Sequence, residues 1–109
     1  MRVILFQDRF AELVRSRQKK QTIRKKARCR PGDELSLRRW TGKPYRSKQE
    51  TLLNTRCAEV LCVIVDEGKT TPKGEAFAKA DGFESLAEMQ DWFHRTHGLP
   101  FHGEIIVWE

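Results

Sequence analysis

Hydrophobic and polar positions alternate in short runs that predict a small domain of mixed strands and helices. Arg2 to Phe6 is a β-branched and apolar run, which is typical of a strand. A helix opened by Asp8 is expected next, because apolar residues then recur at the spacing i, i+4, i+7 and i+8. These residues are Phe6, Phe10, Leu13 and Val14.

The middle of the chain predicts further strands separated by turn signals. Three stretches have the alternating or continuous apolar character of strands. They are Gln21 to Arg24, the segment around Leu35 and Leu37, and Cys57 to Val65. Between them, segments rich in Gly, Pro and polar residues predict turns and loops. These are Pro31 to Asp33, Thr41 to Gln49 and Glu67 to Gly74.

The clearest helix signal lies near the end of the chain. Ser85 and Glu88 have the spacing of a capping box, so a helix is expected from about Ser85 to His97. Glu104 to Glu109 then predicts a closing strand. Five or six short strands and two main helices indicate one α+β domain over residues 1 to 109, with a curled or barrel-like sheet. The expected core is Leu13, Val14, Leu35, Leu37, Val60, Ile64, Leu86, Phe93 and Ile106.

The composition is that of a globular chain. Of its 109 residues, 39% are hydrophobic and 33% charged, which is not the balance of a disordered protein. No apolar run approaches the roughly 20 residues of a membrane-spanning helix. The first residues are typical of a strand and not of a signal peptide. We therefore expect a cytoplasmic protein, a monomer or weak dimer, with no membrane partner.

Charge is distributed unevenly along the chain. Residues 1 to 56 hold 17 Lys or Arg against 5 Asp or Glu, whereas residues 57 to 109 hold 4 against 10. Arg15 to Arg30 contains nine basic residues and no acidic one. This pattern is typical of a surface that neutralises phosphates, which makes RNA an expected partner, and the alternative is a solvated charged face. Trp40 and Tyr45 among the cations also suit base stacking.

The cysteines and histidines do not indicate a metal site. Three cysteines without a C-x-x-C pair argue against a disulfide framework and a zinc knuckle. His94 and His97 would share one helix, and no carboxylate or cysteine motif completes a set of ligands around them. No metal is therefore expected.

The candidate chemistry lies between the first helix and the following strand. Side chains alternate in an extended segment, so Lys20, Thr22 and Arg24 share one face. Lys19, at the helix exit, can fold over that face. Clustered cations and burial both lower the pKa of a lysine, which makes one lysine a candidate general base for the Thr22 hydroxyl. The alternative is that Thr22 is only a β-former and the cations are solvated.

Several short motifs together resemble one known family. They are Phe6-Gln7-x-Arg9-Phe10, Lys19-x-x-Thr22-Ile23-Arg24, Pro31-Gly32-Asp33-x-Leu35 and Asp81-Gly82-Phe83-x-Ser85-x-x-Glu88-Met89. In this order they look like an ASCH domain, a branch of the PUA-like β-barrels, over nearly the whole chain. The family's G-x-K-x-x-[E/T]-x-R element is present, with Arg17 where glycine is usual. The resemblance implies a small mixed β-barrel.

Within that family the chain is most similar to small bacterial amidohydrolases that deacetylate N4-acetylcytidine. The resemblance implies hydrolysis of the N4-acyl amide of cytidine-type nucleosides to a carboxylate, with no metal or organic cofactor. The family's catalytic Lys and Thr correspond to Lys19 and Thr22. Its Glu corresponds to Asp81, one methylene shorter, with Glu84 as the alternative acid.

Three further residues are expected to bind the substrate. Arg24 would stabilise the oxyanion of the attacked carbonyl, and Lys20 would share its face of the strand. Tyr45, in the loop from Thr41 to Gln49, would stack on the base as a lid, although a surface aromatic in a loop is the alternative.

Two other functions fit the same residues. A noncatalytic RNA-binding module would use the same pocket and a broader basic surface, and the charge of residues 1 to 56 favours it. A ribonuclease would use Lys19 and Thr22 on a phosphodiester, but no catalytic histidine pair supports it. Free nucleoside and RNA both stay open as substrates.

Overall fold

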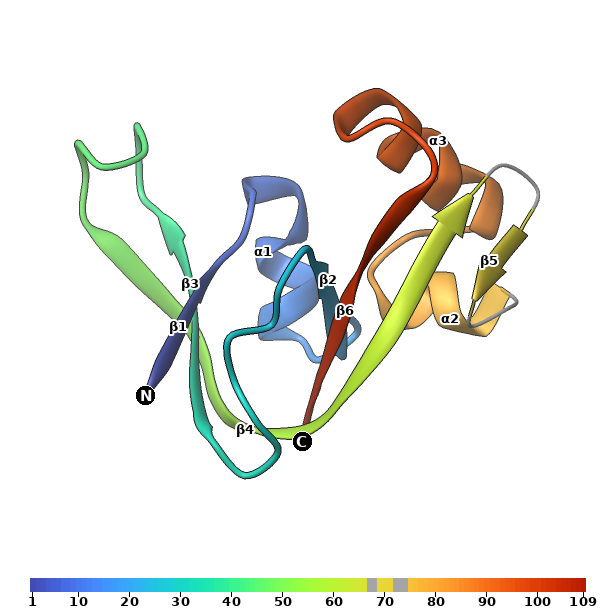
Figure 1. The fold of residues 1–109 in the computed structure, drawn as a ribbon. Coiled ribbons are helices and arrows are strands. Elements are labelled where there is room, and N and C mark those ends of the chain that lie inside the picture. The colour runs from blue at the N-terminus through green and yellow to red at the C-terminus, as the bar shows by residue number, and fades with distance from the viewer. Residues whose placement is uncertain (67–68, 72–74) are drawn as a thin grey trace.

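A computed structural model describes residues 1–66, 69–71 and 75–109. Its elements are β1 (Arg2–Leu5), α1 (Asp8–Arg15), β2 (Gln21–Arg24), β3 (Glu34–Trp40), β4 (Gln49–Asp66), β5 (Lys69–Thr71), α2 (Glu75–Ala80), α3 (Leu86–Thr96) and β6 (Phe101–Trp108). Figure 1 shows the mixed α+β arrangement, which confirms the predicted fold class. Of the turn-rich segment predicted from Glu67 to Gly74, residues 67–68 and 72–74 lie outside the described residues, and 69–71 form a strand.

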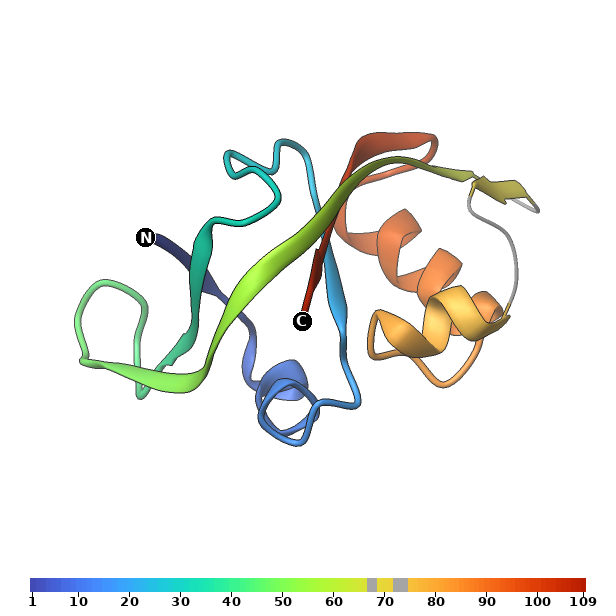
Figure 2. The same cartoon turned by 90° about the horizontal axis from the view of Figure 1, so that it is seen from below.

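One long strand organises the sheet. β4 pairs antiparallel with β3 through residues 49–56 and with β6 through residues 57–65. The sheet order is β1-β3-β4-β6-β2, with β5 paired to the end of β4, and only β1 and β3 are parallel within the described strands. A register shift between Cys57 and Glu59 lies where β4 changes partner, and such a bulge bends a strand. β4 therefore crosses the whole molecule (Figures 1 and 2).

The sheet is open in the described part of the chain. β1 and β2 stand at its two ends and do not pair with each other, so the closed barrel expected from the sequence is not observed. A side chain links these two strands instead, because Arg24 Nη2 donates a hydrogen bond to the Leu5 carbonyl at 2.8 Å. The end of β1 and the end of β2 therefore lie together, and the candidate site lies beside them.

The two predicted helices lie close to their expected limits. α1 begins at Asp8, and α3 begins after Ser85, whose hydroxyl accepts a hydrogen bond from the Glu88 backbone N–H as a capping box requires. A third helix, α2, is an addition to the prediction, because its six residues are too few to produce a helical periodicity. No helix in the described residues has the length and apolar character to span a membrane.

Most residues of the expected core are buried. Those at most 2% exposed are Val14, Leu35, Leu37, Phe93 and Ile106. Those partly buried against the core are Leu13, Val60 and Leu86. The prediction that Ile64 is buried in the core is wrong, because this residue is 42% exposed. Side chains alternate along β4, and Val63 and Val65 face the core, so Ile64 points outward.

Candidate active site

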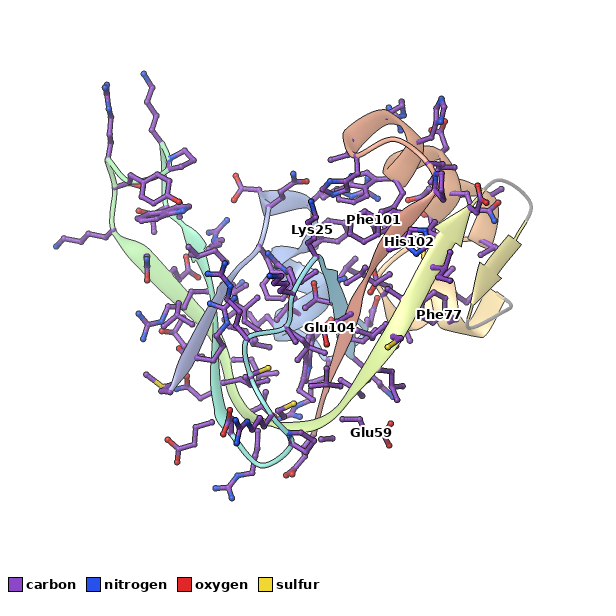
Figure 3. The ribbon with its side chains drawn as sticks, viewed as in Figure 1. Lys25, Glu59, Phe77, Phe101, His102 and Glu104 are labelled. Atoms are coloured by element: carbon purple, nitrogen blue, oxygen red, sulfur yellow. The ribbon has the colours of Figure 1, made fainter. Side chains whose placement is uncertain are left out.

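A cavity of about 320 Å³ lies between the ends of β1 and β2, the start of α1 and the connection from α3 to β6. Its polar residues include Lys19, Thr22, Arg24 and Asp81, three of them from the segment between α1 and the end of β2. Its other wall is aromatic. Lys25 and Phe101, which also line it, lie at the same end of the molecule (Figure 3).

Lys19 reaches the cavity because the chain turns sharply after α1. Arg17 has a left-handed backbone with φ of 64°, and the Lys19 N–H donates to the Leu13 carbonyl at 2.9 Å. The Lys20 N–H donates to the Ala80 carbonyl at 2.8 Å, which joins this turn to the end of α2. Lys19 is consequently 2% exposed, an unusual position for a lysine.

Lys19 and Asp81 form a buried pair although 62 positions separate them. Lys19 Nζ lies 3.4 Å from Asp81 Oδ2 and donates a hydrogen bond to the Asp81 backbone carbonyl. Burial lowers the pKa of Lys19, nearby Arg24 and Arg9 lower it further, and the Asp81 charge opposes them. Burial raises the pKa of Asp81, against the opposing effect of Lys19. The Lys19 shift makes the neutral amine more accessible than in an exposed lysine, and the Asp81 shift makes the protonated carboxyl group more accessible than in an exposed aspartate.

One carboxyl oxygen of Asp81 has no close hydrogen-bond partner among the described residues. Asp81 Oδ1 and Gln21 Nε2 are buried and make no hydrogen bond of ordinary geometry with described atoms. Gln21 nevertheless lies near enough to lower the pKa of the carboxyl group. An unused acceptor in a cavity lining is a feature expected of a binding or catalytic group.

Thr22 and Arg24 are neighbours on the cavity side of β2. Thr22 is buried, and its Oγ1 accepts a hydrogen bond from Arg24 Nε at 3.3 Å. The Arg24 guanidinium lies 5.2 Å from the centroid of the Phe6 ring and is also tied to the Leu5 carbonyl. Among the described residues, no hydrogen bond joins Lys19 Nζ to Thr22 Oγ1. The lysine amine therefore contacts the acid, and the hydroxyl contacts the arginine.

Gly82 makes room for the buried lysine. Its φ of +97° is strained for any residue with a side chain. A Cβ at this position would lie 3.2 Å from Lys19 Cδ and 3.3 Å from Phe10 Cδ1. Glycine at position 82 thus allows the backbone after Asp81 to approach Lys19 closely.

An aromatic cluster forms the opposite wall and was not predicted as part of the site. The His97 ring lies 5.0 Å from the Phe101 ring and 5.6 Å from those of Trp92 and Phe93, measured between centroids. From the sequence, Phe93 is expected in the core, and His94 and His97 are expected to be ordinary side chains that bind no metal. The concentration of aromatic residues between Trp92 and His102 is the sequence feature that could have indicated this wall.

Three predicted residues do not line this cavity. Lys20 is exposed, because β2 begins only at Gln21 and the chain is still turning at Lys20, so the strand alternation does not extend to it. Tyr45 is 87% exposed at the tip of the hairpin between β3 and β4. Glu84 is exposed in a groove that also contains Lys20, which leaves Asp81 as the acid of the cavity.

Neither a set of metal ligands within the described residues nor a similar known protein gives a further indication of function. In the chain as described, no group of three or more His, Cys, Asp or Glu side chains could hold a metal ion. Comparisons with family models, curated proteins and solved structures gave no match for this chain. Functional inference therefore depends on the residues of the cavity.

Proposed function

We propose that this protein is an amidohydrolase that cleaves the N4-acyl amide of cytidine-type nucleosides and has an ASCH-like, PUA-like fold. The observation that carries the proposal is the buried Lys19–Asp81 pair beside the Thr22 hydroxyl in one cavity. A base, an acid and a hydroxyl nucleophile are the groups that metal-independent acyl transfer requires.

The proposed reaction has two stages. Neutral Lys19 accepts the Thr22 proton after its flexible side chain turns from Asp81, and Thr22 Oγ1 attacks the acyl carbonyl carbon. Arg24 stabilises the resulting oxyanion. The bond from carbon to N4 then breaks, and Asp81 donates a proton to the departing amine. Asp81, now a carboxylate, accepts a proton from the water that attacks the Thr22 ester. Lys19 returns its proton to Thr22 Oγ1 as the ester bond breaks, which restores the hydroxyl and the neutral amine, and the released acid loses its proton to solvent as the carboxylate.

The shape of the cavity suits a nucleobase. Its volume of about 320 Å³ is in the range of small-molecule sites. The rings of Trp92, Phe93, His97 and Phe101 provide flat surfaces against which a pyrimidine can stack. The opposite polar wall would then receive the acylated amine.

One backbone feature supports the resemblance to ASCH domains. Arg17 occupies the position at which that family usually has glycine, and its φ of 64° lies in the left-handed region that favours glycine. Residue 17 therefore has a backbone conformation that glycine, the usual residue of the family at this position, adopts without strain.

The proposal is tested by incubating the protein with N4-acetylcytidine and measuring cytidine by chromatography. Lys19→Ala should reduce the rate at least about 100-fold, since general-base catalysis contributes that much or more. Lys20→Ala is the matched control and should retain the rate, because Lys20 is exposed outside the cavity. An unmodified protein that hydrolyses no N4-acylcytidine would contradict the proposal.

A noncatalytic RNA-binding module is the second candidate. Lys25, Lys26, Arg28 and Arg30 are exposed in the connection from β2 to β3, directly after the cavity residues of β2. Phosphate contacts from this loop would make RNA affinity fall steeply with salt. This candidate requires no hydrolysis, so the chromatographic assay separates it from the first.

A further inference from the structure

The hairpin between β3 and β4 has no part in the proposed reaction, yet its tip gathers cations. We call residues 41–48 the β3–β4 tip. Lys43, Arg46 and Lys48 are exposed in it, and none of them forms an ion pair with an acidic side chain in the described residues. The tip projects from the body of the molecule, and long side chains extend from it (Figures 1 and 3).

The exposed position of the Tyr45 side chain at this tip is not one that stabilises the fold. Its ring packs on Trp40 at 5.1 Å between centroids and an angle of 49°, but the residue stays 87% exposed. Burial this small contributes little hydrophobic stabilisation. The Tyr45 φ of 63° is also strained for a residue that is not glycine. An aromatic ring held in water by a strained backbone is a feature of binding sites.

The tip is ordered before any partner arrives. The Lys48 carbonyl accepts hydrogen bonds from the Thr41 N–H at 2.9 Å and from Thr41 Oγ1 at 2.8 Å. The Ser47 hydroxyl accepts from the Gly42 N–H at 3.0 Å and donates to the Lys43 carbonyl at 2.9 Å. Little conformational entropy would therefore be lost when a ligand binds.

We propose that the β3–β4 tip binds single-stranded nucleic acid. Tyr45, supported by Trp40, stacks against a base, while Lys43, Arg46 and Lys48 contact phosphates. Stacking on exposed aromatics together with cation contacts is how proteins hold single strands without reading their sequence. This surface is separate from the cavity, so the inference does not depend on the proposed function.

The position of the tip also relates it to the cavity. In Figure 1 the tip and the connection from α3 to β6 rise on the same side of the molecule, with the connection from β1 to α1 between them. Residues of both connections line the cavity. The tip and the two connections that border the cavity therefore lie on the same side of the molecule.

The test uses fluorescein-labelled ten-nucleotide RNA and DNA of one sequence, with binding measured by fluorescence anisotropy at two salt concentrations. Tyr45→Ala should weaken binding roughly 5- to 100-fold, the contribution of one stacked base. Tyr45→Phe should keep most of the affinity because it keeps the ring. The double variant Lys43→Gln with Arg46→Gln should weaken binding and reduce the salt slope by about 0.7 for each cation removed.

The matched control is Lys25→Gln with Lys26→Gln, which removes the same charge from the loop after β2. A smaller loss of oligonucleotide affinity in this control than in the tip variants supports the proposal. Unchanged affinity in Tyr45→Ala overturns it, as does an equal loss in both charge variants. Tyr45-dependent binding to anionic phospholipid vesicles without binding to either oligonucleotide would assign the tip to membranes and also overturn it. Hydrolysis of free N4-acetylcytidine should be unchanged in all tip variants, so the two proposals fail separately.

Discussion

At the residue scale, the distinctive feature is that Lys19 and Asp81 are two ionisable groups buried beside each other. Because the pKa of Lys19 is lowered below the ordinary 10.5, the unfolded chain binds more protons there, and this contribution to the unfolding free energy rises with pH up to 10.5. The pKa of Asp81 is raised above 3.8, so the folded chain binds more protons, and its contribution falls as pH rises from 3.8. The pair therefore contributes least to the unfolding free energy at a pH between 3.8 and 10.5.

Replacing the Lys19–Asp81 pair by apolar residues should show that burying two ionisable groups lowers the stability of the protein. The double variant Lys19→Met with Asp81→Leu should be as stable as the unmodified protein or more stable, by up to about 4 kcal/mol. Lys19→Met alone should lose about 3 to 5 kcal/mol, because it leaves Asp81 buried without its partner. Chemical denaturation at neutral pH measures both. A double variant less stable than Lys19→Met would show that the pair is needed for folding.

The ionisation of Lys19 gives a second prediction. The Asp81 charge holds the pKa of Lys19 up, so Asp81→Asn should lower that pKa further, and the shift is measured by NMR titration of the lysine side chain. Glu84→Gln is the matched control and should leave the Lys19 titration unchanged, because Glu84 is exposed outside the cavity. An upward shift in Asp81→Asn would show that the carboxyl group does not act on the amine as described.

At the element scale, the site depends on how α1 leads into β2 and α2 leads into α3. The first turn delivers Lys19, and the second delivers Asp81 and Gly82. Both turns are irregular, and side-chain alternation within β2 correctly placed Thr22 and Arg24 but failed at Lys20, one residue before the strand begins.

Gly82→Ala tests the second turn. The new Cβ would press on Lys19 Cδ at 3.2 Å, so hydrolysis of N4-acetylcytidine should fall at least about 10-fold, as misplacement of catalytic groups does. Gly32→Ala is the matched control, with a φ of +95° but no atom within 4 Å of its Cβ. Both variants should lose about 1 kcal/mol or more of stability from backbone strain, and Gly82→Ala should lose more because its Cβ also meets Lys19 and Phe10, as measured by thermal unfolding. Equal activity in the two variants would contradict the packing role of Gly82.

At the scale of the whole molecule, the pattern of the sequence was sufficient for the fold class but not for the shape of the sheet. Apolar alternation located most of the strands, and capping signals located α3. The same pattern could not show that β4 would run for 18 residues and bend at Cys57, because register is fixed by pairing between distant strands. It also misplaced Ile64, since an apolar run does not indicate which face is covered.

The candidate site was predicted only in part, because the local pattern does not show which side chains meet in the folded chain. Strand alternation and the motif resemblance both indicate Lys19 and Thr22, the resemblance alone indicates Asp81, and the cavity contains all three. Trp92 and His97 were not assigned to the site, because a helical aromatic looks the same in sequence whether it packs in a core or lines a cavity. For Tyr45 the sequence predicts either a lid that stacks on the base or a surface aromatic, and in the structure its ring packs on Trp40 while the residue is 87% exposed.

The most direct test of the proposed amidohydrolase is a double-variant cycle on Lys19 and Thr22 with N4-acetylcytidine as substrate. If Thr22 is the nucleophile and Lys19 its base, Thr22→Ala and Lys19→Ala should each remove nearly all cytidine formation. The double variant should then be little slower than either single one, because the two groups act as a unit. Thermal unfolding of each variant checks that the protein is still folded. Full cytidine formation by folded Thr22→Ala would contradict the assigned nucleophile.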